Sequence, residues 1–328
     1  MATANTLERI FSVNNRSRIQ PIVSLCKRGE GLENLNYPNG VTIDNSTGDI
    51  YVADCENNCV KVFDCNGKIM FKFGDEEREG KMYRPNGLAI CRDRILISHR
   101  NDCILTYQLN GKFISRIGKH GKGELEFDYP LGLTFEESSS EVYICDSENN
   151  RIQILSKELT YKTQFGQDYL KSPLDVKLTN EFIYILDRSE LCLHLYDYHL
   201  ILHKSIIFRG DGFEQISLIF FCIDNSNNIL ITDIASRYIF IFNSQLYLIH
   251  ELFITYSTGI TVDNRGRVII VCDGGEHCLN IFCCFYILLI FILLFMFLFR
   301  ITILLHLKKL YVSYLFDISH LIEVAFNL

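Results

Sequence analysis

The sequence predicts an all-β fold, a six-bladed β-propeller over residues 18–282. A short pattern, in which two apolar runs follow a Pro-x-Gly or related tripeptide, occurs six times along the chain. Successive copies are 40–48 residues apart when they are aligned on the last residue of the second run, namely Asp54, Ser98, Asp146, Asp187, Asp233 and Asp273. Repeats of this length that consist of short β-runs are typical of propellers, in which each repeat forms a four-stranded blade.

The first copy shows the four strands of a blade. We expect them, from the centre of the propeller outward, at 41–44, 49–54, 59–64 and 68–74. Asp-Asn-Ser-Thr-Gly at 44–48 suits the turn after the first strand. Asn66-Gly67 is a strong two-residue hairpin signal between the third and fourth strands, and Asn110-Gly111 repeats it in the second copy.

Glycines occur where the innermost strands begin, at Gly40, Gly87, Gly132 and Gly259. A residue without a Cβ permits close backbone approach, which the crowded centre of a propeller requires. The sixth copy stops after 277–282, without a fourth strand, whereas 18–31 resembles the outer strand and loop at 112–124. We therefore expect the N-terminal segment to complete the last blade and close the ring. An α/β fold is the alternative, but no helical period separates the strand-like runs.

Helix is expected only near the C-terminus. Residues 281–299 carry no charge or polar amide, which is enough length for a helix to cross a bilayer. We assign a transmembrane helix to 283–305 and a short tail to 306–328, with 1–17 as an N-terminal extension. The N-terminus has no signal peptide, so the propeller is expected in the cytoplasm, anchored to the membrane by this helix. If the apolar run is translated non-coding sequence instead, the protein is cytoplasmic.

Composition supports a folded core and sets limits on partners. Of 328 residues, 48% are hydrophobic and 22% are charged, with a net charge of −7 that disfavours a general polyanion binder. The 13 cysteines form no CxxC pair, and the densest group, Cys55, Cys59 and Cys65, lacks the fourth ligand of a zinc site. We predict buried thiols in a reducing compartment, with no metal and no cofactor.

Residues 37–63 and 129–155 resemble NHL repeats, the propeller repeats of tripartite-motif ubiquitin ligases and of several sensors and lyases. Asp-Ser-Glu-Asn-Asn-Arg-Ile-Gln at 146–153 is most similar to the family pattern, and 118–130 resembles its inter-blade loop. The resemblance is strong in blades 1–3 and weak in blades 4 and 5. It implies a recognition module like the C-terminal domain of those ligases; without a RING or B-box segment before the propeller, it does not imply ligase activity.

Two groups of residues are candidates for catalysis, namely the histidines and the repeated aspartates. His99, His120 and His277 are expected in loops of one face, which lyases of this fold are understood to use for metal ligands. No acidic partner lies beside all three, so solvated loop histidines are favoured. A catalytic residue is needed once, whereas the aspartate recurs in nearly every blade. We therefore assign it the structural role of accepting hydrogen bonds from backbone N–H groups of the loop that follows.

The sequence thus predicts a non-enzymatic binding platform that recognises a protein in a ubiquitin-ligase-like or scaffold system. The partner site is expected on the face of the inter-blade loops and of the loops between second and third strands, at Arg84, His99, Arg100, Lys119, His120, Asn149, Asn150, Arg151, Arg188 and Arg237. Acidic residues such as those in 74–80 interrupt the basic ones, which favours a protein ligand over single-stranded RNA. An RNA-binding propeller and a metal-dependent lyase are the alternatives. For Arg151, an ion pair with Asp146 or Glu148 that braces its own blade is the competing role.

Overall fold

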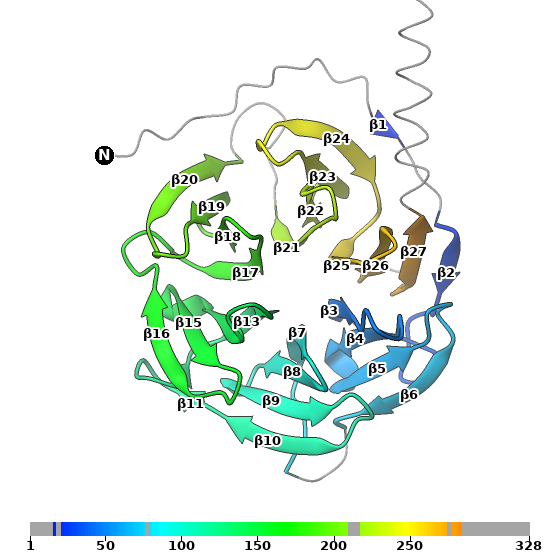
Figure 1. Ribbon diagram of the computed structural model, residues 1–328. Helices are drawn as coiled ribbons and strands as arrows, with labels where there is room; N and C mark the ends of the chain where they lie inside the picture. Colours follow the sequence, from blue (N-terminus) through cyan, green and yellow to red (C-terminus); the bar gives the residue numbers. More distant parts are fainter. Residues whose placement is uncertain (1–15, 18–20, 76–78, 209–216, 274–276, 284–328) are drawn as a thin grey trace, which may run out of the picture. The chain divides into compact units, whose positions relative to one another are not determined.

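The computed structural model describes residues 16–17, 21–75, 79–208, 217–273 and 277–283. In these ranges the chain forms antiparallel sheets that are arranged as six blades around a central axis (Figure 1). In each blade the first strand lies nearest the axis and the last lies at the rim. The prediction of an all-β, six-bladed propeller is confirmed.

The strands follow the repeat in chain order. Blade 1 contains β3 (Pro38–Ile43), β4 (Ile50–Asp54), β5 (Cys59–Phe63) and β6 (Ile69–Phe73). Blade 2 contains β7 (Pro85–Cys91), β8 (Arg94–His99), β9 (Cys103–Gln108) and β10 (Phe113–Ile117). Blade 3 contains β13 (Pro130–Glu136), β14 (Glu141–Asp146), β15 (Arg151–Ser156) and β16 (Tyr161–Phe165). Blade 4 contains β17 (Pro173–Leu178), β18 (Ile183–Asp187), β19 (Cys192–Tyr196) and β20 (Leu202–Ile207).

The last two blades are joined by the N-terminal segment. Blade 5 contains β21 (Leu218–Ile223), β22 (Ile229–Asp233), β23 (Tyr238–Phe242) and β24 (Leu248–Phe253), and β1 (Arg16–Ser17) pairs in parallel with β24. Blade 6 contains β25 (Ser257–Val262), β26 (Arg267–Cys272) and β27 (Leu279–Cys283). Its fourth strand is β2 (Val23–Leu25), which pairs antiparallel with β27. The expected closure of the ring by the N-terminus is therefore confirmed.

The hydrophobic core lies between neighbouring blades. Val60 and Val62 of blade 1, for example, belong to the same buried cluster as Ile95 and Leu105 of blade 2. Each central strand is buried on both faces because it is covered by a blade on either side, which is why β4 and β18 read as continuous apolar runs that end in aspartate. Burial between sheets, rather than within one, holds the blades in a ring.

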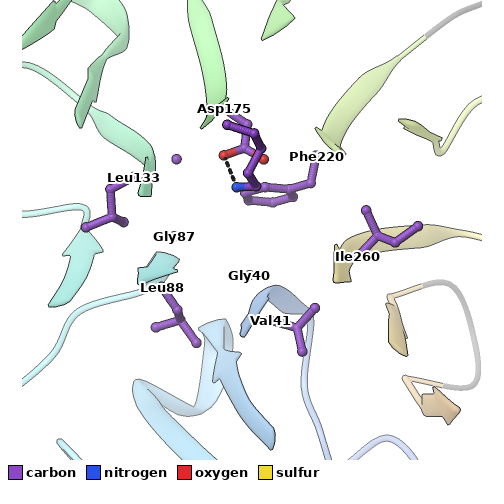
Figure 2. A pocket seen from close by; sticks show the side chains of 10 residues that line it. Gly40, Val41, Gly87, Leu88, Leu133, Asp175, Phe220 and Ile260 are labelled. Carbon is purple, nitrogen blue, oxygen red and sulfur yellow. Dashed lines mark hydrogen bonds and ion pairs between the residues drawn. The ribbon is translucent and has the colours of Figure 1, made fainter. Parts of the chain in front are cut away.

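Glycine permits the innermost strands to approach one another at the central channel (Figure 2). A Cβ added at Gly40 would collide with the carbonyl oxygen of Asn86, and one at Gly87 with that of Leu131. The register pairs Val41 with Val52 and Val176 with Ile185, so Asp175 and Gly40 occupy equivalent positions.

Blade 4 thus places a carboxylate at the channel. Asp175 is fully buried, and its Oδ1 lies 2.8 Å from the ammonium nitrogen of Lys177. Burial raises the pKa of this carboxyl, while the lysine opposes that shift. Asp175 and Lys177 line the channel together with apolar side chains, such as those of Leu88 and Ile260, which are labelled with Asp175 in Figure 2.

The outer turns differ from the two-residue hairpins expected at Asn66-Gly67 and Asn110-Gly111. The turn of blade 1 extends from Asp64 to Lys68, whose backbone groups are hydrogen-bonded, and Asp64 Oδ1 accepts the N–H of Asn66. Gly67 and Gly111 have positive φ angles of 85° and 86°, whereas the preceding asparagines do not. The connection is therefore a longer turn with a single left-handed glycine and a bulge in the strand pair.

In blades 2 and 6 the residue equivalent to Asp54 lies one position before or after the residue that the sequence pattern predicts. The residue paired with the start of the innermost strand is Asp54 in blade 1, but it is His99, not Ser98, in blade 2 and Cys272, not Asp273, in blade 6. Ser98 is fully buried and its hydroxyl bridges two blades, because it accepts the N–H of Gly87 and donates to the carbonyl of Leu131. The serine therefore does not replace the aspartate.

The chain divides into two units, Met1–Phe282 and Cys283–Leu328. The predicted transmembrane helix at 283–305 and the tail at 306–328 lie outside the described residues, apart from Cys283 at the end of β27, and so does most of the extension at 1–17. Within the described ranges, the structure contains no helix with the length and apolar character needed to cross a membrane. The membrane anchor therefore stays a prediction.

Substitution of Gly87 by alanine tests the close packing at the channel. The new methyl group would meet backbone atoms of the next blade, which cannot move away as a side chain can. We expect a loss of about 1–3 kcal/mol in the free energy of unfolding, measured by urea denaturation. Gly31→Ala is the control, because its Cβ would meet only the flexible side chain of Asn34. Equal stabilities of the two variants would contradict the packing argument.

Candidate functional site

One face of the propeller, called the loop face here, is formed by two sets of connections. The inter-blade loops contribute 26–37, 74–84, 118–129, 166–172 and 254–256, and the loops between second and third strands contribute 55–58, 100–102, 147–150, 188–191 and 234–237, within the described residues. Every residue predicted for the partner site belongs to these connections or to the strand ends beside them. The structure divides these residues into buried and exposed groups.

Buried aspartates fix the inter-blade loops. Each accepts a hydrogen bond from a backbone N–H just before the innermost strand of its own blade: Asp54 from Asn36 (2.6 Å), Asp146 from Asp128 (2.7 Å), Asp187 from Lys171 (2.7 Å) and Asp233 from Ser217 (2.7 Å). The predicted structural role is confirmed, but these donors precede the blade. Asp187 and Asp233 also accept backbone N–H groups of the loop that follows, at Ser189 and Ala235, as predicted. At Asp54 and Asp146 that loop donates through the side-chain amides of Asn57 and Asn149.

Arg151 is a brace inside blade 3. Its side chain is 2% exposed, and Nε lies 2.7 Å from Asp146 Oδ2. Its two terminal nitrogens donate to the carbonyls of Lys122, Gly123 and Glu126 at 2.8–2.9 Å, so the guanidinium holds the loop 118–129 in place. The placement of Arg151 on a partner-binding surface is therefore corrected, because its donors are used within the protein.

Lys61 performs the same task in blade 1, which the sequence analysis missed. Its side chain is 0% exposed, Nζ lies 2.8 Å from Asp54 Oδ2, and it donates to the carbonyls of Gly31 and Asn34. In blade 3 the cation directly follows Asn149-Asn150, whereas Lys61 lies two residues further along from Asn57-Asn58. Aligning the loop 27–36 with 119–128 would have revealed the need for a buried cation in both blades.

Three further predicted site residues also serve the fold. His99 is the last residue of β8 and is 1% exposed, with Nε2 2.7 Å from the sulfur of Cys103. Burial lowers the pKa of His99 to about 4, so the ring is neutral near pH 7. Asn149 donates to Asp146 and to the carbonyl of Gly121, and Asn150 supplies the left-handed turn (φ 57°) before β15. The expectation of a solvated loop position is wrong for His99.

Exposed arginines on the loop face lie over tyrosine rings. The guanidinium carbon of Arg100 is 5.4 Å from the ring centre of Tyr129, and that of Arg237 is 4.7 Å from the ring centre of Tyr256. Both arginines also donate to the tyrosine hydroxyl, at 3.0 and 2.9 Å. Arg28, not predicted from the sequence, lies 5.4 Å from the ring centre of Tyr37, which is 42% exposed.

The remaining basic residues of the predicted site lie among carboxylates. Arg84 pairs with Glu56 (2.7 Å), and Lys119 pairs with Glu126 (3.1 Å), while Arg188 is exposed. His120 Nδ1 lies 3.1 Å from Asp102 and 3.8 Å from Asp128. The loop face therefore presents alternating charges rather than a continuous positive surface.

The histidines do not converge on a metal. His99 and His277 are each 1% exposed and use ring nitrogens within the protein. Within the described ranges, one group of potential ligands comes together, Asp102, His120 and Asp128, with ligand atoms within 4.8 Å. The imidazole lies between the two carboxylates, so a hydrogen bond to Asp102 accounts for this arrangement.

Comparisons with known proteins agree with this geometry. A family model described as NHL repeat matches residues 35–63 and 127–155, which contain the buried aspartate and the buried cation of blades 1 and 3. Blades 1 and 3 thus contain NHL repeats. Protein brain tumor of Drosophila melanogaster is 32% identical over 165 residues, which is 48% of this chain and 15% of that protein. The chain therefore spans a small part of this curated relative.

Solved structures share the fold of this propeller at low identity. The WD40 repeats of RRP9 align with a TM-score of 0.60 and 10% identity, over 79% of this chain and 96% of that one. Virginiamycin B lyase from Staphylococcus aureus aligns with a TM-score of 0.56 and 11% identity, over 80% and 87%. Hydrazine synthase of Kuenenia stuttgartiensis aligns at 0.58 and 8%, over 76% and 96%. These likenesses concern the propeller architecture alone.

Truncation of Arg151 to alanine should destabilise the propeller strongly. It would leave the buried Asp146 carboxylate without its cation and would remove one donor from each of three loop carbonyls, those of Lys122, Gly123 and Glu126. We expect a loss of about 3–5 kcal/mol in unfolding free energy by urea denaturation. Arg100→Ala, which removes an exposed side chain on the same face, should change it by less than about 0.5 kcal/mol. Similar losses for both variants would show that Arg151 is no brace.

Stability should fall in mild acid because of His99. Its pKa is about 4 in the folded chain and about 6.5 when unfolded, so the unfolded state binds more protons in between. The stabilisation is complete above pH 6.5 and is lost as the pH falls towards 4. Between pH 7 and 5 we expect a loss of roughly 2 kcal/mol from this residue. Urea titrations of wild type and His99→Gln measure it; an identical pH dependence of the two would refute the assignment.

Proposed function

We propose that the NHL propeller is a non-enzymatic binding module that recognises a protein ligand on its loop face. The observation that carries this proposal is the set of exposed arginine–tyrosine pairs, Arg28–Tyr37, Arg100–Tyr129 and Arg237–Tyr256. Arginine and tyrosine are enriched at the centres of protein interfaces, since both combine a large contact area with directional donors. Each arginine is already held against its ring, which lowers the entropy lost on binding.

The charge distribution favours a protein over a polyanion. Glu56, Asp102 and Glu126 lie within hydrogen-bonding distance of basic side chains on the loop face. A nucleic-acid backbone would be repelled by these carboxylates, whereas a protein surface of mixed charge can complement them. By its resemblance to the repeats of tripartite-motif proteins, we propose substrate recognition in a ubiquitin-ligase-like system as the setting.

Single-stranded RNA is the second candidate. Tyrosine rings and guanidinium planes on one face are the stacking elements that bind unpaired bases. Tyr83 and Tyr169 in neighbouring inter-blade loops, 50% and 55% exposed, extend the aromatic surface. A strong loss of affinity with added salt would distinguish RNA from a protein ligand, because phosphate contacts release counterions.

A metal-dependent lyase is the least supported alternative. The lyase likeness is confined to the fold, at 11% identity, and His99 and His277 are buried away from the loop surface. Metal analysis of the purified protein tests this alternative directly. Stoichiometric zinc that is lost in His120→Ala would favour the enzyme over the binding module.

The arginines of the loop face should carry ligand affinity. A peptide-display library selected on the full chain provides the protein probe, and a poly(U) 12-mer provides the RNA probe. The triple variant Arg28→Ala, Arg100→Ala and Arg237→Ala should weaken the preferred probe at least about 100-fold, as expected for lost interface anchors, with little change in melting temperature. Arg265→Ala, an exposed arginine in the turn between β25 and β26, is the control. Undiminished affinity in the triple variant would contradict the proposed site.

A further inference from the structure

Three junctions between blades in the described part of the propeller share one device. A residue in the left-handed conformation just before a third strand offers its side chain to the backbone N–H that precedes the innermost strand of the next blade. The pairs are Asn58 Oδ1 with Arg84 N–H (2.9 Å), Asp102 Oδ1 with Tyr129 N–H (2.8 Å) and His277 Nδ1 with Tyr37 N–H (2.9 Å). All six residues have positive φ angles of 43–56°. The geometry is the same, but the acceptor chemistry differs.

Of these three acceptors, the His277 side chain is the one that becomes a donor in mild acid. An amide oxygen, as in Asn58, does not titrate, and a carboxyl group, as in Asp102, offers an acceptor oxygen in either protonation state. A neutral imidazole accepts at one nitrogen only, and protonation of Nδ1 replaces that lone pair by an N–H. The protonated ring would then place a donor against the Tyr37 donor.

This junction is the one at which the ring closes. Tyr37 begins the first blade and His277 lies in the last, 240 residues away. The closing strand pair, β2 with β27, is only three residues long on the β2 side. Thr258 of blade 6 also donates its hydroxyl to the carbonyl of Pro38, at 2.8 Å. The histidine therefore joins the two ends of the propeller together with Thr258, Asn264, which binds Asn45, and Arg267, which donates to the carbonyl of Cys65.

The surroundings favour a neutral ring. His277 is 1% exposed and its ring meets that of Tyr37 edge to face, with 4.8 Å between centroids. The charged groups that face it are Arg28 from the inter-blade loop, Asp54 from β4 and Asp273 after β26. Asp54 is paired with Lys61, at 2.8 Å. Burial first, and then Arg28, lower the pKa of His277, while the two carboxylates oppose this.

We propose that His277 is a pH-sensitive latch of ring closure, which releases the Tyr37 N–H when a proton from solvent binds Nδ1. Release loosens the junction between blades 6 and 1 and, with it, the Arg28–Tyr37 pair on the loop face. Because the pKa of His277 is lowered in the folded chain, the latch is closed above pH 6.5 and opens progressively as the pH falls below that value. The junctions at Asn58 and Asp102 keep a hydrogen-bond acceptor in this pH range.

The chain itself supplies the matched variants for a test. His277→Asn and His277→Asp install the acceptors that the sister junctions use, Asn58 and Asp102, in the same backbone conformation. Both should remain acceptors at pH 5.5. His203→Asn changes an exposed histidine in β20 that pairs with Asp197 and serves as the control for loss of a titrating group.

Hydrogen exchange of the full chain, measured by mass spectrometry at pH 7.5 and 5.5 and corrected for intrinsic rates, provides the readout. In wild type and His203→Asn, protection of 22–37 should fall about fivefold or more relative to blade 3 (130–156) at pH 5.5, the factor expected for one lost hydrogen bond. In His277→Asn and His277→Asp the ratio should stay constant. The proposal fails if wild type keeps its protection at pH 5.5, or if either variant that folds loses it as wild type does.

Discussion

The buried carboxylate at the end of the second strand is the interaction on which the rest of this propeller depends. In blades 1, 3, 4 and 5 it accepts the backbone N–H that leads into the innermost strand, and so joins the loop between blades to the interior of the next sheet. A charge without access to water requires partners. In blades 1 and 3 these partners are Lys61 and Arg151, which also bind carbonyls of the same loop. The aspartate, the cation and the loop therefore form one structural unit.

This unit explains which residues remain for recognition. Arg151, Asn149 and His99 direct their polar groups inward, since each satisfies a buried carboxylate, a loop carbonyl or a thiol. Arg100 and Arg237 come from the same short loops but lie on tyrosine rings that face solvent. Loops that are braced from below present their exposed side chains on a fixed framework, which is how rigid scaffolds commonly carry binding sites.

Much of the fold could be predicted because the repeat period and the alternation of apolar runs are written in every blade. The structural role of Asp146 followed from repetition alone. The register of blade 2 could not, because the loop 100–102 is one residue shorter than 55–58, which moves His99 into the aspartate position. The division of the predicted site residues into buried and exposed groups could not be predicted for a different reason. Spacing places Arg151 beside a loop, but its burial depends on the strand register, which pairs it with Asp146. The tyrosines that the exposed arginines cover come from a different loop, so their contact depends on the tertiary structure.

The most direct test of the account is amide hydrogen exchange, measured by NMR, at Asn36, Asp128, Lys171 and Ser217, the four N–H groups bound to the buried aspartates. These amides lie in loops, yet the account predicts protection comparable to that of the central strands β4 and β14, because opening one of them would leave a buried carboxylate short of a donor. Exchange at the rate of an exposed loop would contradict the claim that these carboxylates hold the loop face together.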